Sequence, residues 1–329
     1  MERIGDPIDL RLLDDWQRNL PIVPRPFFSI GQDLGCGEKE VVRRLNILMA
    51  SGKITRVGAT CAPNTVSAST LAALAAPEEK LEAVAEVVGR QPGVNHSYQR
   101  EDRWNLWFVA TGPDKSHVTG VLRDIELQTG LRVLDLPLVR PFNVDLGFSL
   151  NGGMSRPPVP RPVQKERLRE GDNDLLQLLT TGMPLTERPF LRIAETLNRR
   201  EEDVLERVSI LQEAGIIARL GVIVRHRALG WRANAMVVWD IEPERIDLAG
   251  PQLAAQSGVT LCYERHPVQG VWPFRLYCMI HAQSRKNALE TLARVSRLPE
   301  LEGVPHRVLF SSRCFKQTGA MIAHRGAAA

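Results

Sequence analysis

The sequence predicts an α+β protein built as a tandem repeat, in which each copy is a winged helix-turn-helix followed by a ferredoxin-like βαββαβ domain. Three observations predict this architecture. One register of identical residues recurs along the chain, three helical segments and a strand open each copy, and a β-α-β-β-α-β order follows them. A chain of 329 residues, 43% of them apolar, suits two to four domains.

An internal repeat divides the chain into two halves. Arg25-Pro26-Phe27 recurs as Arg188-Pro189-Phe190, an offset of 163 residues. The same offset pairs further residues, among them Ile30 with Ile193, Glu38 with Glu201, Arg44 with Arg207, Gly52 with Gly215 and Gly58 with Gly221. At an offset of 165 the match resumes with Gly93 and Gly258, Tyr98 and Tyr263, and Arg100 and Arg265. Chance does not hold one register so long, so the halves are expected to share one fold.

Each half opens with the signals of a helix-turn-helix. In the first copy helices are expected over 8–19, 26–34 and 38–51, followed by a strand over 54–61. In the second copy Asn173 or Asp174 is expected to cap the first helix, a second helix begins near Pro189, and a third ends at Gly215. An alternating segment over 216–225 then predicts a strand, which we interpret as the wing of a strand hairpin.

The rest of each half predicts the split βαβ pattern. The second copy is expected to contain strands 233–241, 258–266, 274–282 and 304–312 with helices 245–256 and 284–298. The first copy is expected to contain strands 70–76, 93–100, 104–111 and 131–140. Such an antiparallel sheet carries helices on one face and needs cover on the other. We therefore expect the two sheets to pair around a pseudo-twofold axis.

These elements divide the chain into five parts. The predicted parts are a winged helix-turn-helix over 1–66, a ferredoxin-like domain over 67–150, a Pro-rich linker over 151–172, a second winged helix-turn-helix over 173–230, and a second ferredoxin-like domain with a C-terminal tail over 231–329.

Composition excludes several classes of protein. The five cysteines form no C-x-x-C pair and have no His at zinc-ligand spacing, which argues against a disulfide framework, a metal site or an iron–sulfur cluster. No signal peptide or membrane-length apolar stretch is present, so a cytoplasmic protein without membrane contact is expected. Lys occurs only seven times among 42 basic residues. This excess of Arg fits either ordinary surface composition or a polycarboxylate ligand, which a guanidinium grips in fixed bidentate geometry.

Particular segments carry a family resemblance. A helix-turn-helix followed by this kind of domain is similar to the Lrp/AsnC regulators. The segments 96–100 (HSYQR), 104–108 (WNLWF), 262–265 (CYER), 272–274 (WPF) and 276–281 (LYCMIH) resemble the sirohaem decarboxylases, the NirD/NirL and AhbA/AhbB proteins. The first copy resembles the NirD type and the second the NirL type, as in a fused NirDL protein of haem d1 biosynthesis. The resemblance implies removal of acetate carboxyls of sirohaem as CO2, towards 12,18-didecarboxysirohaem, without a further organic cofactor.

The residue types in these segments suit that chemistry. Positions two apart on a strand share a face, so His96, Tyr98 and Arg100 are expected to point one way. We predict catalytic roles for His96, Tyr98, His281 and Tyr263, because imidazole and phenol groups can deliver the proton that replaces CO2. The predicted substrate-binding residues are Arg100, Arg265, His266, Trp272, Arg275, Tyr277 and Lys316. The large aromatics Trp104, Trp107, Phe108 and Phe274 are expected to be mostly core.

The two copies are not equivalent at these positions. The repeat aligns His96 with Leu261, His281 with Thr111 and Lys316 with Asn143. One composite or dominant site per chain is therefore expected, rather than two identical ones.

Two other functions remain as alternatives. A DNA-binding regulator of Lrp/AsnC type is disfavoured because its recognition helices would carry a surplus of Lys and Arg, whereas residues 199–213 hold three positive and five negative side chains. A tetrapyrrole-binding protein without turnover is not separated from an enzyme by sequence. The expected partners are sirohaem and its product, a second copy in a homodimer or higher homo-oligomer, and NirG-like and NirH-like proteins.

Overall fold

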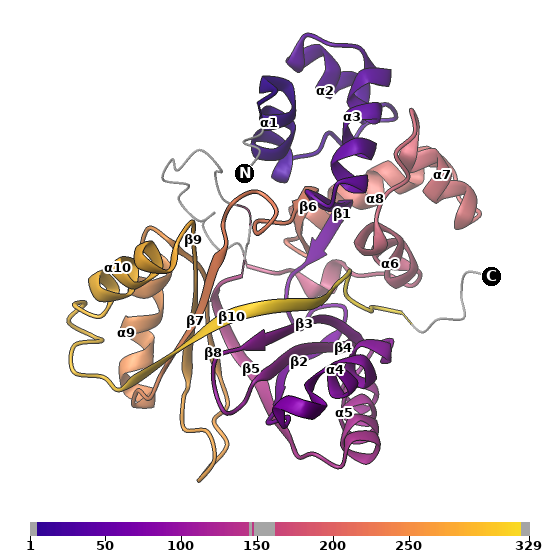
Figure 1. Cartoon of the computed structure of the whole chain (residues 1–329). Helices are drawn as coiled ribbons and strands as arrows, with labels where there is room; N and C mark the ends of the chain where they lie inside the picture. The colour runs from indigo at the N-terminus through magenta and orange to yellow at the C-terminus, as the bar shows by residue number, and fades with distance from the viewer. Residues whose placement is uncertain (1–4, 145–146, 148–161, 324–329) are drawn as a thin grey trace.

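The computed structural model describes residues 5–144, 147 and 162–323 (Figure 1). The first part of the predicted linker, up to residue 161, lies outside the described residues. Helix-turn-helix units occupy one end of the molecule, and the two α/β domains occupy the other (Figure 1). No helix within the described ranges is both long and apolar enough to cross a bilayer.

The two α/β domains share one closed antiparallel barrel. Within the described residues its strands follow the order β10-β3-β4-β2-β5-β8-β9-β7. The first copy supplies β2 (Ala68–Leu74), β3 (Val94–Arg100), β4 (Leu106–Gly112) and β5 (Val133–Asn143). The second copy supplies β7 (Ala233–Trp239), β8 (Val259–Arg265), β9 (Leu276–Ala282) and β10 (His306–Gln317). All eight strands predicted for the two α/β domains are therefore present, and β10 extends five residues past its expected end at 312.

The barrel closes because the last strand of each copy also pairs with the other copy. The first half of β5 pairs with β2, and from Leu138 onward β5 pairs with β8. In the same way β10 pairs with β7 up to Phe310 and with β3 from Ser311 onward. The expected pairing of the two sheets is confirmed, and it adds a feature that the sequence did not predict: the sheets join edge to edge at two seams.

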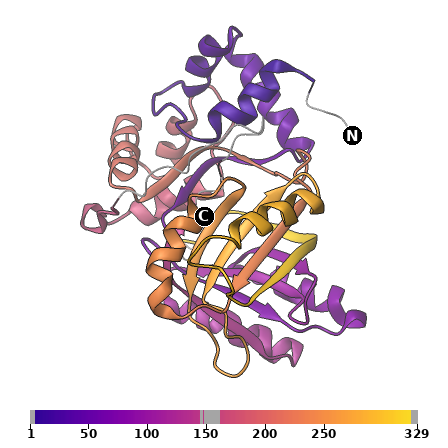
Figure 2. The ribbon, with the colours of Figure 1, turned by 90° about the vertical axis from the view of Figure 1, so that its left-hand side faces the viewer.

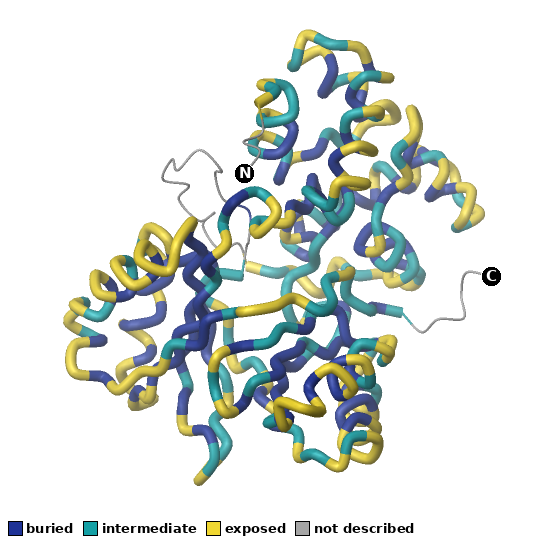
Figure 3. The backbone as a smooth tube through the Cα atoms, in the orientation of Figure 1, coloured by how far each residue is buried: buried dark blue, intermediate teal, exposed yellow. Residues whose placement is uncertain are grey.

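Helices cover the outside of the barrel (Figure 2), and many of its strand residues are buried (Figure 3). Apolar side chains of both copies form a core inside it. The covering helices are α4 (Leu81–Arg90) and α5 (Lys115–Thr129) on the first sheet, and α9 (Pro243–Ala254) and α10 (Arg285–Val295) on the second. The shared inner core contains Trp107, Trp272, Tyr277 and Leu309, drawn from both copies. The four aromatics that were predicted to be core, Trp104, Trp107, Phe108 and Phe274, are all buried.

The helix-turn-helix units follow the predicted order. Their helices are α1 (Pro7–Asp14), α2 (Pro26–Leu34) and α3 (Glu38–Ala50) in the first unit, and α6 (Asp172–Thr181), α7 (Pro189–Thr196) and α8 (Glu201–Glu213) in the second. Two details differ from expectation. The first helix stops at Asp14 and continues as a 3-10 turn, and α6 is preceded by Gly171, so Asn173 and Asp174 lie inside its first turn and not at the cap.

The predicted wing is wrong in its pairing. The strands β1 (Ile54–Cys61) and β6 (Ile217–Val224) form as expected, but neither belongs to a hairpin within its own copy. They pair with each other, with Gly58 opposite Gly221 at the centre. A Cβ on Gly58 would meet the carbonyl oxygen of Leu179 in α6 at 2.3 Å, so glycine at this position allows α6 to pack closely against β1. The two units consequently share one core.

Ion pairs recur at equivalent places in both units. Arg44 pairs with Asp9 at 2.8 Å, and its counterpart Arg207 pairs with the buried Asp172. Likewise Arg25 pairs with Glu38, and Arg188 with Glu201. These recurring ion pairs explain why charged residues, and not only apolar ones, match between the two halves of the sequence.

We predict that the inner core holds the two copies together. Trp107 is 1% exposed and packs against Trp272, with ring centroids 5.3 Å apart. Trp107→Ala should lower the free energy of unfolding by about 3–5 kcal/mol, because it leaves a cavity between the sheets. Leu127→Ala, on the exposed face of α5, is the control and should change stability by less than about 0.5 kcal/mol. Urea unfolding followed by circular dichroism measures both, and equal stabilities would contradict the assignment.

Candidate functional site

One face of β3 brings three predicted site residues together inside the barrel. His96, Tyr98 and Arg100 alternate along the strand, and the rings of His96 and Tyr98 stack with centroids 6.4 Å apart. The Arg100 guanidinium lies 5.7 Å from the centre of the Tyr98 ring. The predicted common face is therefore present.

Arg100 crosses a seam and contacts the second copy. Its Nη1 donates to the Leu309 carbonyl oxygen of β10 at 3.1 Å and to Asn234 Oδ1 of β7 at 3.3 Å. Arg100 is 6% exposed, and its buried Nε has no hydrogen-bond partner among the described residues. Burial lowers the pKa of Arg100 to about 10, which still leaves it charged at neutral pH. A buried cation of this kind is suited to an anionic ligand.

His281, from β9, lies beside Arg100. Its Nε2 is 2.7 Å from Asn234 Nδ2, and its Nδ1 is 2.7 Å from Thr260 Oγ1. The His226 ring, from the segment between β6 and β7, has its centroid 5.5 Å from that of His281. Burial, and then the charge of Arg100, lower the pKa of His281 from 6.5 to about 4. The histidine is thus neutral at pH 7 in the protein without a ligand.

His96 and Tyr98 are more accessible than Arg100 and His281. The side chains of His96 and Tyr98 are each partly exposed, and Tyr98 lies opposite the exposed Cys314 of β10. Desolvation inside the barrel and the guanidinium of Arg56, from β1, lower the pKa of His96. Burial also raises the pKa of the Tyr98 hydroxyl. Since β1 belongs to the helix-turn-helix sheet, that sheet contributes a charge to this end of the barrel.

Tyr263 and Arg265 occupy the equivalent positions at the other seam. Arg265 Nη1 donates to the Leu136 carbonyl oxygen of β5 at 2.6 Å, as Arg100 does to Leu309. The Arg265 guanidinium lies 4.6 Å from the centre of the Tyr263 ring. Burial raises the pKa of Tyr263, while the charges of Arg265 and Arg100 oppose that effect. The charges of both arginines therefore act on Tyr263.

The second seam has no histidine at the place of His281. Thr111 occupies it, and Thr111 Oγ1 accepts a hydrogen bond from the Met321 backbone N–H at 2.9 Å. The segment around Met321 thus lies against this side of the barrel, and the side-chain oxygen of Gln177 in α6 accepts hydrogen bonds from the Ile322 and Ala323 backbone N–H groups. The asymmetry expected from the sequence is present in the structure.

Five predicted substrate-binding residues lie away from His281. Trp272 and Tyr277 are fully buried in the inner core, where Trp272 Nε1 donates a hydrogen bond to the Tyr277 hydroxyl at 2.8 Å. Arg275 and the exposed His266 lie at the opposite end of β8 and β9, where Glu264 faces Leu276. Lys316 points outside the barrel, where its Nζ donates to the Gly89 and Gln91 carbonyl oxygens at the end of α4.

Three residues of the cluster were not predicted from the sequence. They are Asn234, Thr260 and His226, which surround His281. Asn234 had a usable signal, since it is a polar residue on the inward face of an otherwise apolar strand that also carries Met236 and Val238. Thr260 and His226 had no such signal in the sequence. Among the described residues, no group of three or more His, Cys, Asp or Glu side chains is arranged to hold a metal ion.

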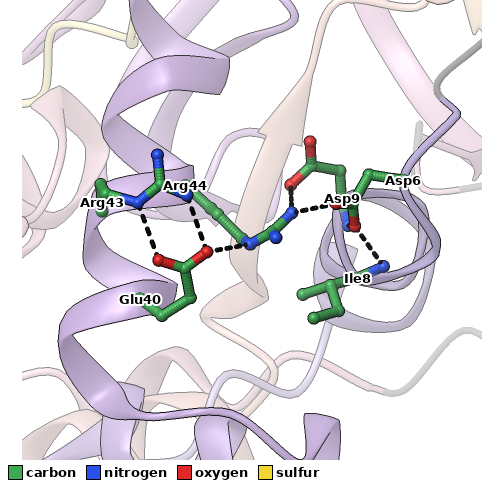
Figure 4. A network of polar contacts seen from close by, with 6 residues as sticks. All are labelled: Asp6, Ile8, Asp9, Glu40, Arg43 and Arg44. Atoms are coloured by element: carbon green, nitrogen blue, oxygen red, sulfur yellow. Dashed lines mark hydrogen bonds and ion pairs between the residues drawn. The ribbon is translucent and has the colours of Figure 1, made fainter.

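The helix that would read DNA has its arginines engaged by acids. Figure 4 shows Arg44 of α3 between Glu40, at 2.7 Å, and the carboxylates of Asp6, the N-cap of α1, and Asp9, at 2.9 and 2.8 Å. Arg43 also pairs with Glu40 at 2.7 Å, and the two arginines lower the pKa of Glu40 to about 2. In the second unit the Arg207–Asp172 pair repeats the Arg44–Asp9 pair, and Arg200, at the N-cap of α8, pairs with Asp203 of that helix. Guanidiniums already paired with carboxylates are poorly suited to bind phosphate.

Comparison with known proteins assigns both kinds of domain. Residues 66–143 and 228–316 match the family described as "AsnC-like ligand binding domain", and residues 9–54 and 172–217 match "Siroheme decarboxylase NirDL-like HTH domain". The "Siroheme decarboxylase NirDL subunit" of Paracoccus denitrificans (strain Pd 1222) is 52% identical over 318 residues, which cover 97% of this chain and 98% of that protein.

A solved structure and a shorter relative add to this comparison. The crystal structure of the siroheme decarboxylase NirDL in co-complex with an iron-uroporphyrin III analogue is 26% identical, covers 95% of this chain and 92% of its own, and superposes with a TM-score of 0.65. The "Siroheme decarboxylase NirH subunit" of Paracoccus pantotrophus is 37% identical over 151 residues, covering 46% of this chain and 94% of that protein.

The neutral His281 makes stability depend on pH. Its pKa is about 4 in the folded protein and 6.5 as the ordinary value, so unfolding takes up a proton between these limits. The stabilising contribution is complete above pH 6.5 and is lost as the pH falls towards 4. We expect the melting temperature of the native protein to fall over this range and that of His281→Gln to fall less. A His266→Gln variant, changed at an exposed histidine, serves as control, and parallel curves for all three proteins would contradict the prediction.

Proposed function

The chain belongs to the sirohaem decarboxylase family, of the fused NirDL type, and from this premise we propose that it removes acetate carboxyl groups of sirohaem as CO2, towards 12,18-didecarboxysirohaem in haem d1 biosynthesis. We place the reaction at the seam between β3 and β10, where His96, Tyr98 and Arg100 of the first copy meet His281 of the second. Tyr263 completes this set from β8.

The observation that carries the proposal is the meeting of Arg100 and His281 through one shared side chain, Asn234. A buried guanidinium with spare donor capacity can hold a carboxylate. A histidine next to it can supply a proton. The two groups come from different copies of the repeat, so the site exists only when the barrel is closed.

The reaction needs little else from the protein. When the bond between the acetate methylene and its carboxylate breaks, CO2 leaves and the electron pair stays on the methylene carbon, where the macrocycle delocalises it. One proton then converts the methylene into a methyl group, and no oxidant or reductant is consumed. His281 and His96 are the proposed acids, and Tyr98 and Tyr263 assist. A carboxylate brought next to these histidines raises their pKa towards neutrality, which offsets the effect of burial.

A single site of this kind per chain follows from the asymmetry of the seams. The second seam keeps Arg265 and Tyr263 but has Thr111 where His281 would be. We propose that Arg265 and Arg275 hold other carboxylates of the macrocycle, with His266, Trp272 and Tyr277 shaping the far end of the inner surface. Lys316 is not included, because its ammonium group is bound to the end of α4.

We further propose a homo-oligomer and a cytoplasmic location. The cytoplasm keeps thiols reduced, and all five cysteines are free. Proteins of the NirG and NirH type are proposed as partners, since a NirH subunit is among the relatives. The paired arginines of α3 and α8 support an enzyme over a DNA-binding regulator.

The first prediction concerns capture of the substrate. Arg100→Ala should raise the dissociation constant for sirohaem roughly 10- to 150-fold, the effect of losing one charge-assisted hydrogen bond worth about 1.5–3 kcal/mol. Lys316→Ala is the matched control, because it also removes one positive charge from the β3–β10 seam but on the outer side of the strand. Spectroscopic titration under anaerobic conditions measures both. Equal affinities for the two variants would remove Arg100 from the site.

The second prediction concerns chemistry. His96→Ala and His281→Ala should both still show the spectrum of bound sirohaem, and at least one should lose about 10²–10⁴-fold in the rate of CO2 release, the usual contribution of a general acid. Product mass counts each lost CO2 directly. If both variants turn over like the native protein, the acid lies elsewhere. If neither variant binds sirohaem, these histidines bind the substrate, and their assignment as proton donors is wrong.

A further inference from the structure

A chain of four hydrogen bonds fixes the state of His281. Arg100 Nη1 donates to Asn234 Oδ1 at 3.3 Å, Asn234 Nδ2 lies 2.7 Å from His281 Nε2, His281 Nδ1 lies 2.7 Å from Thr260 Oγ1, and the Thr260 hydroxyl donates to the Met279 carbonyl oxygen at 3.1 Å. Each direction follows from the ends. A guanidinium has only donors, so the amide atom that faces Arg100 is oxygen. The amide nitrogen therefore faces His281 and donates to Nε2.

The same reasoning assigns the tautomer from the other side. The Thr260 hydroxyl hydrogen is directed to Met279, so Thr260 Oγ1 accepts from His281 Nδ1. His281 thus carries its proton on Nδ1 and presents a lone pair on Nε2. The hydrogen bonds on both sides of His281 thus indicate the same neutral tautomer, with the proton on Nδ1. Burial also favours the neutral imidazole.

Protonation of His281 is incompatible with this arrangement. A hydrogen on Nε2 would face the hydrogens of Asn234 Nδ2, two donors in contact at 2.7 Å. Turning the Asn234 amide by half a rotation would resolve that conflict but would place the amide nitrogen against Arg100, again donor against donor. Protonated His281 and the contact between Arg100 and Asn234 therefore exclude each other.

We propose that Asn234 couples the capture of a substrate carboxylate by Arg100 to the protonation of His281. The inference rests on the proposed function, in which Arg100 binds a carboxylate of sirohaem. A carboxylate is a stronger acceptor than an amide oxygen, so it takes the Arg100 donors and releases Asn234 Oδ1. The amide then turns and accepts from Nε2–H. Asn234 is a positioning residue here: it acts through His281 and makes the acid available only when a carboxylate is in place.

The surroundings of His281 agree with this role. Within the described ranges, Arg100 of β3 is the charged group whose effect on His281 is resolved, and its charge opposes protonation until a carboxylate neutralises it. His226, beside its ring, comes from the segment before β7. The neighbours on β7 and β8, Asn234 and Thr260, carry no charge. At the pseudo-equivalent place in the first copy, Ser69 lies opposite Thr111 as Asn234 lies opposite His281.

The test reads the imidazole directly. In protein labelled with ¹⁵N-histidine, long-range spectra distinguish Nδ1–H, Nε2–H and imidazolium, and comparison with His281→Gln identifies the signals of His281. The native protein without ligand should show the Nδ1–H tautomer. Saturation with uroporphyrin III, a diamagnetic macrocycle with acetate and propionate carboxylates, should raise the pKa of His281. Asn234→Asp should raise it by about two pH units without any ligand, because a carboxylate accepts from Arg100 and Nε2–H together.

Two further variants keep the test decisive. Ser69→Asp introduces the same carboxylate at the equivalent place in the first copy and should leave the titration of His281 unchanged. Asn234→Ser removes the amide donor and leaves a hydroxyl that can accept a hydrogen bond, and it serves if the buried aspartate prevents folding; it should also raise the pKa of His281. With sirohaem, Asn234→Ser should shift the pH dependence of kcat for CO2 release while KM stays within about twofold.

The outcomes separate the two proposals. An Nε2–H tautomer in the free native protein, an unchanged His281 pKa in both Asn234 variants, or uroporphyrin binding that leaves His281 neutral would each overturn the role of Asn234, even if CO2 release is normal. Failure of the native protein to decarboxylate sirohaem would overturn the proposed function instead. The tautomer and the pKa in the free protein would still decide whether the relay exists.

Discussion

The exchange of strands at the two seams is the constraint on which the rest of the structure depends. Each copy ends in a long strand whose first half completes its own sheet and whose second half completes the other one. The inner face of each sheet is covered only because the second sheet closes over it. Arg100 and Arg265 each donate across a seam to a carbonyl oxygen of the exchanged strand. Binding groups are thus held by the same contacts that close the barrel.

The helix-turn-helix units are joined by the same principle of shared strands. The wing strands of the two units pair with each other around Gly58 and Gly221, and Arg44 and Arg207 of the third helices pair with nearby acids. The units have the fold of a helix-turn-helix, but these arginines are already paired with carboxylates. Arg56 of this shared sheet acts on His96, so the units contribute to the electrostatics of the barrel end that they cover.

Much of the fold could be predicted from the sequence because the repeat is a long-range pattern, and alternation on β3 placed His96, Tyr98 and Arg100 correctly. Lys316 shows why the rest could not be predicted. It lies two residues after Cys314, which would put both on one face, but a bulge sets Cys314 opposite Tyr98 and Lys316 opposite Ser97. One extra residue in the strand sends the side chain outside. Asn234 and Thr260 belong to no motif, and only the pairing of β7, β8 and β9 brings them to His281.

Closure of the barrel by β10 has a consequence for how the chain is made on the ribosome. Synthesis proceeds from the N-terminus, and the strand that seals the first sheet is encoded at 306–317, more than two hundred residues after β3. Until that segment emerges, the edge of β3 has no partner, and the nascent first half presents an open sheet edge. An exposed edge of this kind is prone to pair with other chains. A fused chain delivers the correct partner strand at high local concentration, which is an advantage of linking both halves in one polypeptide.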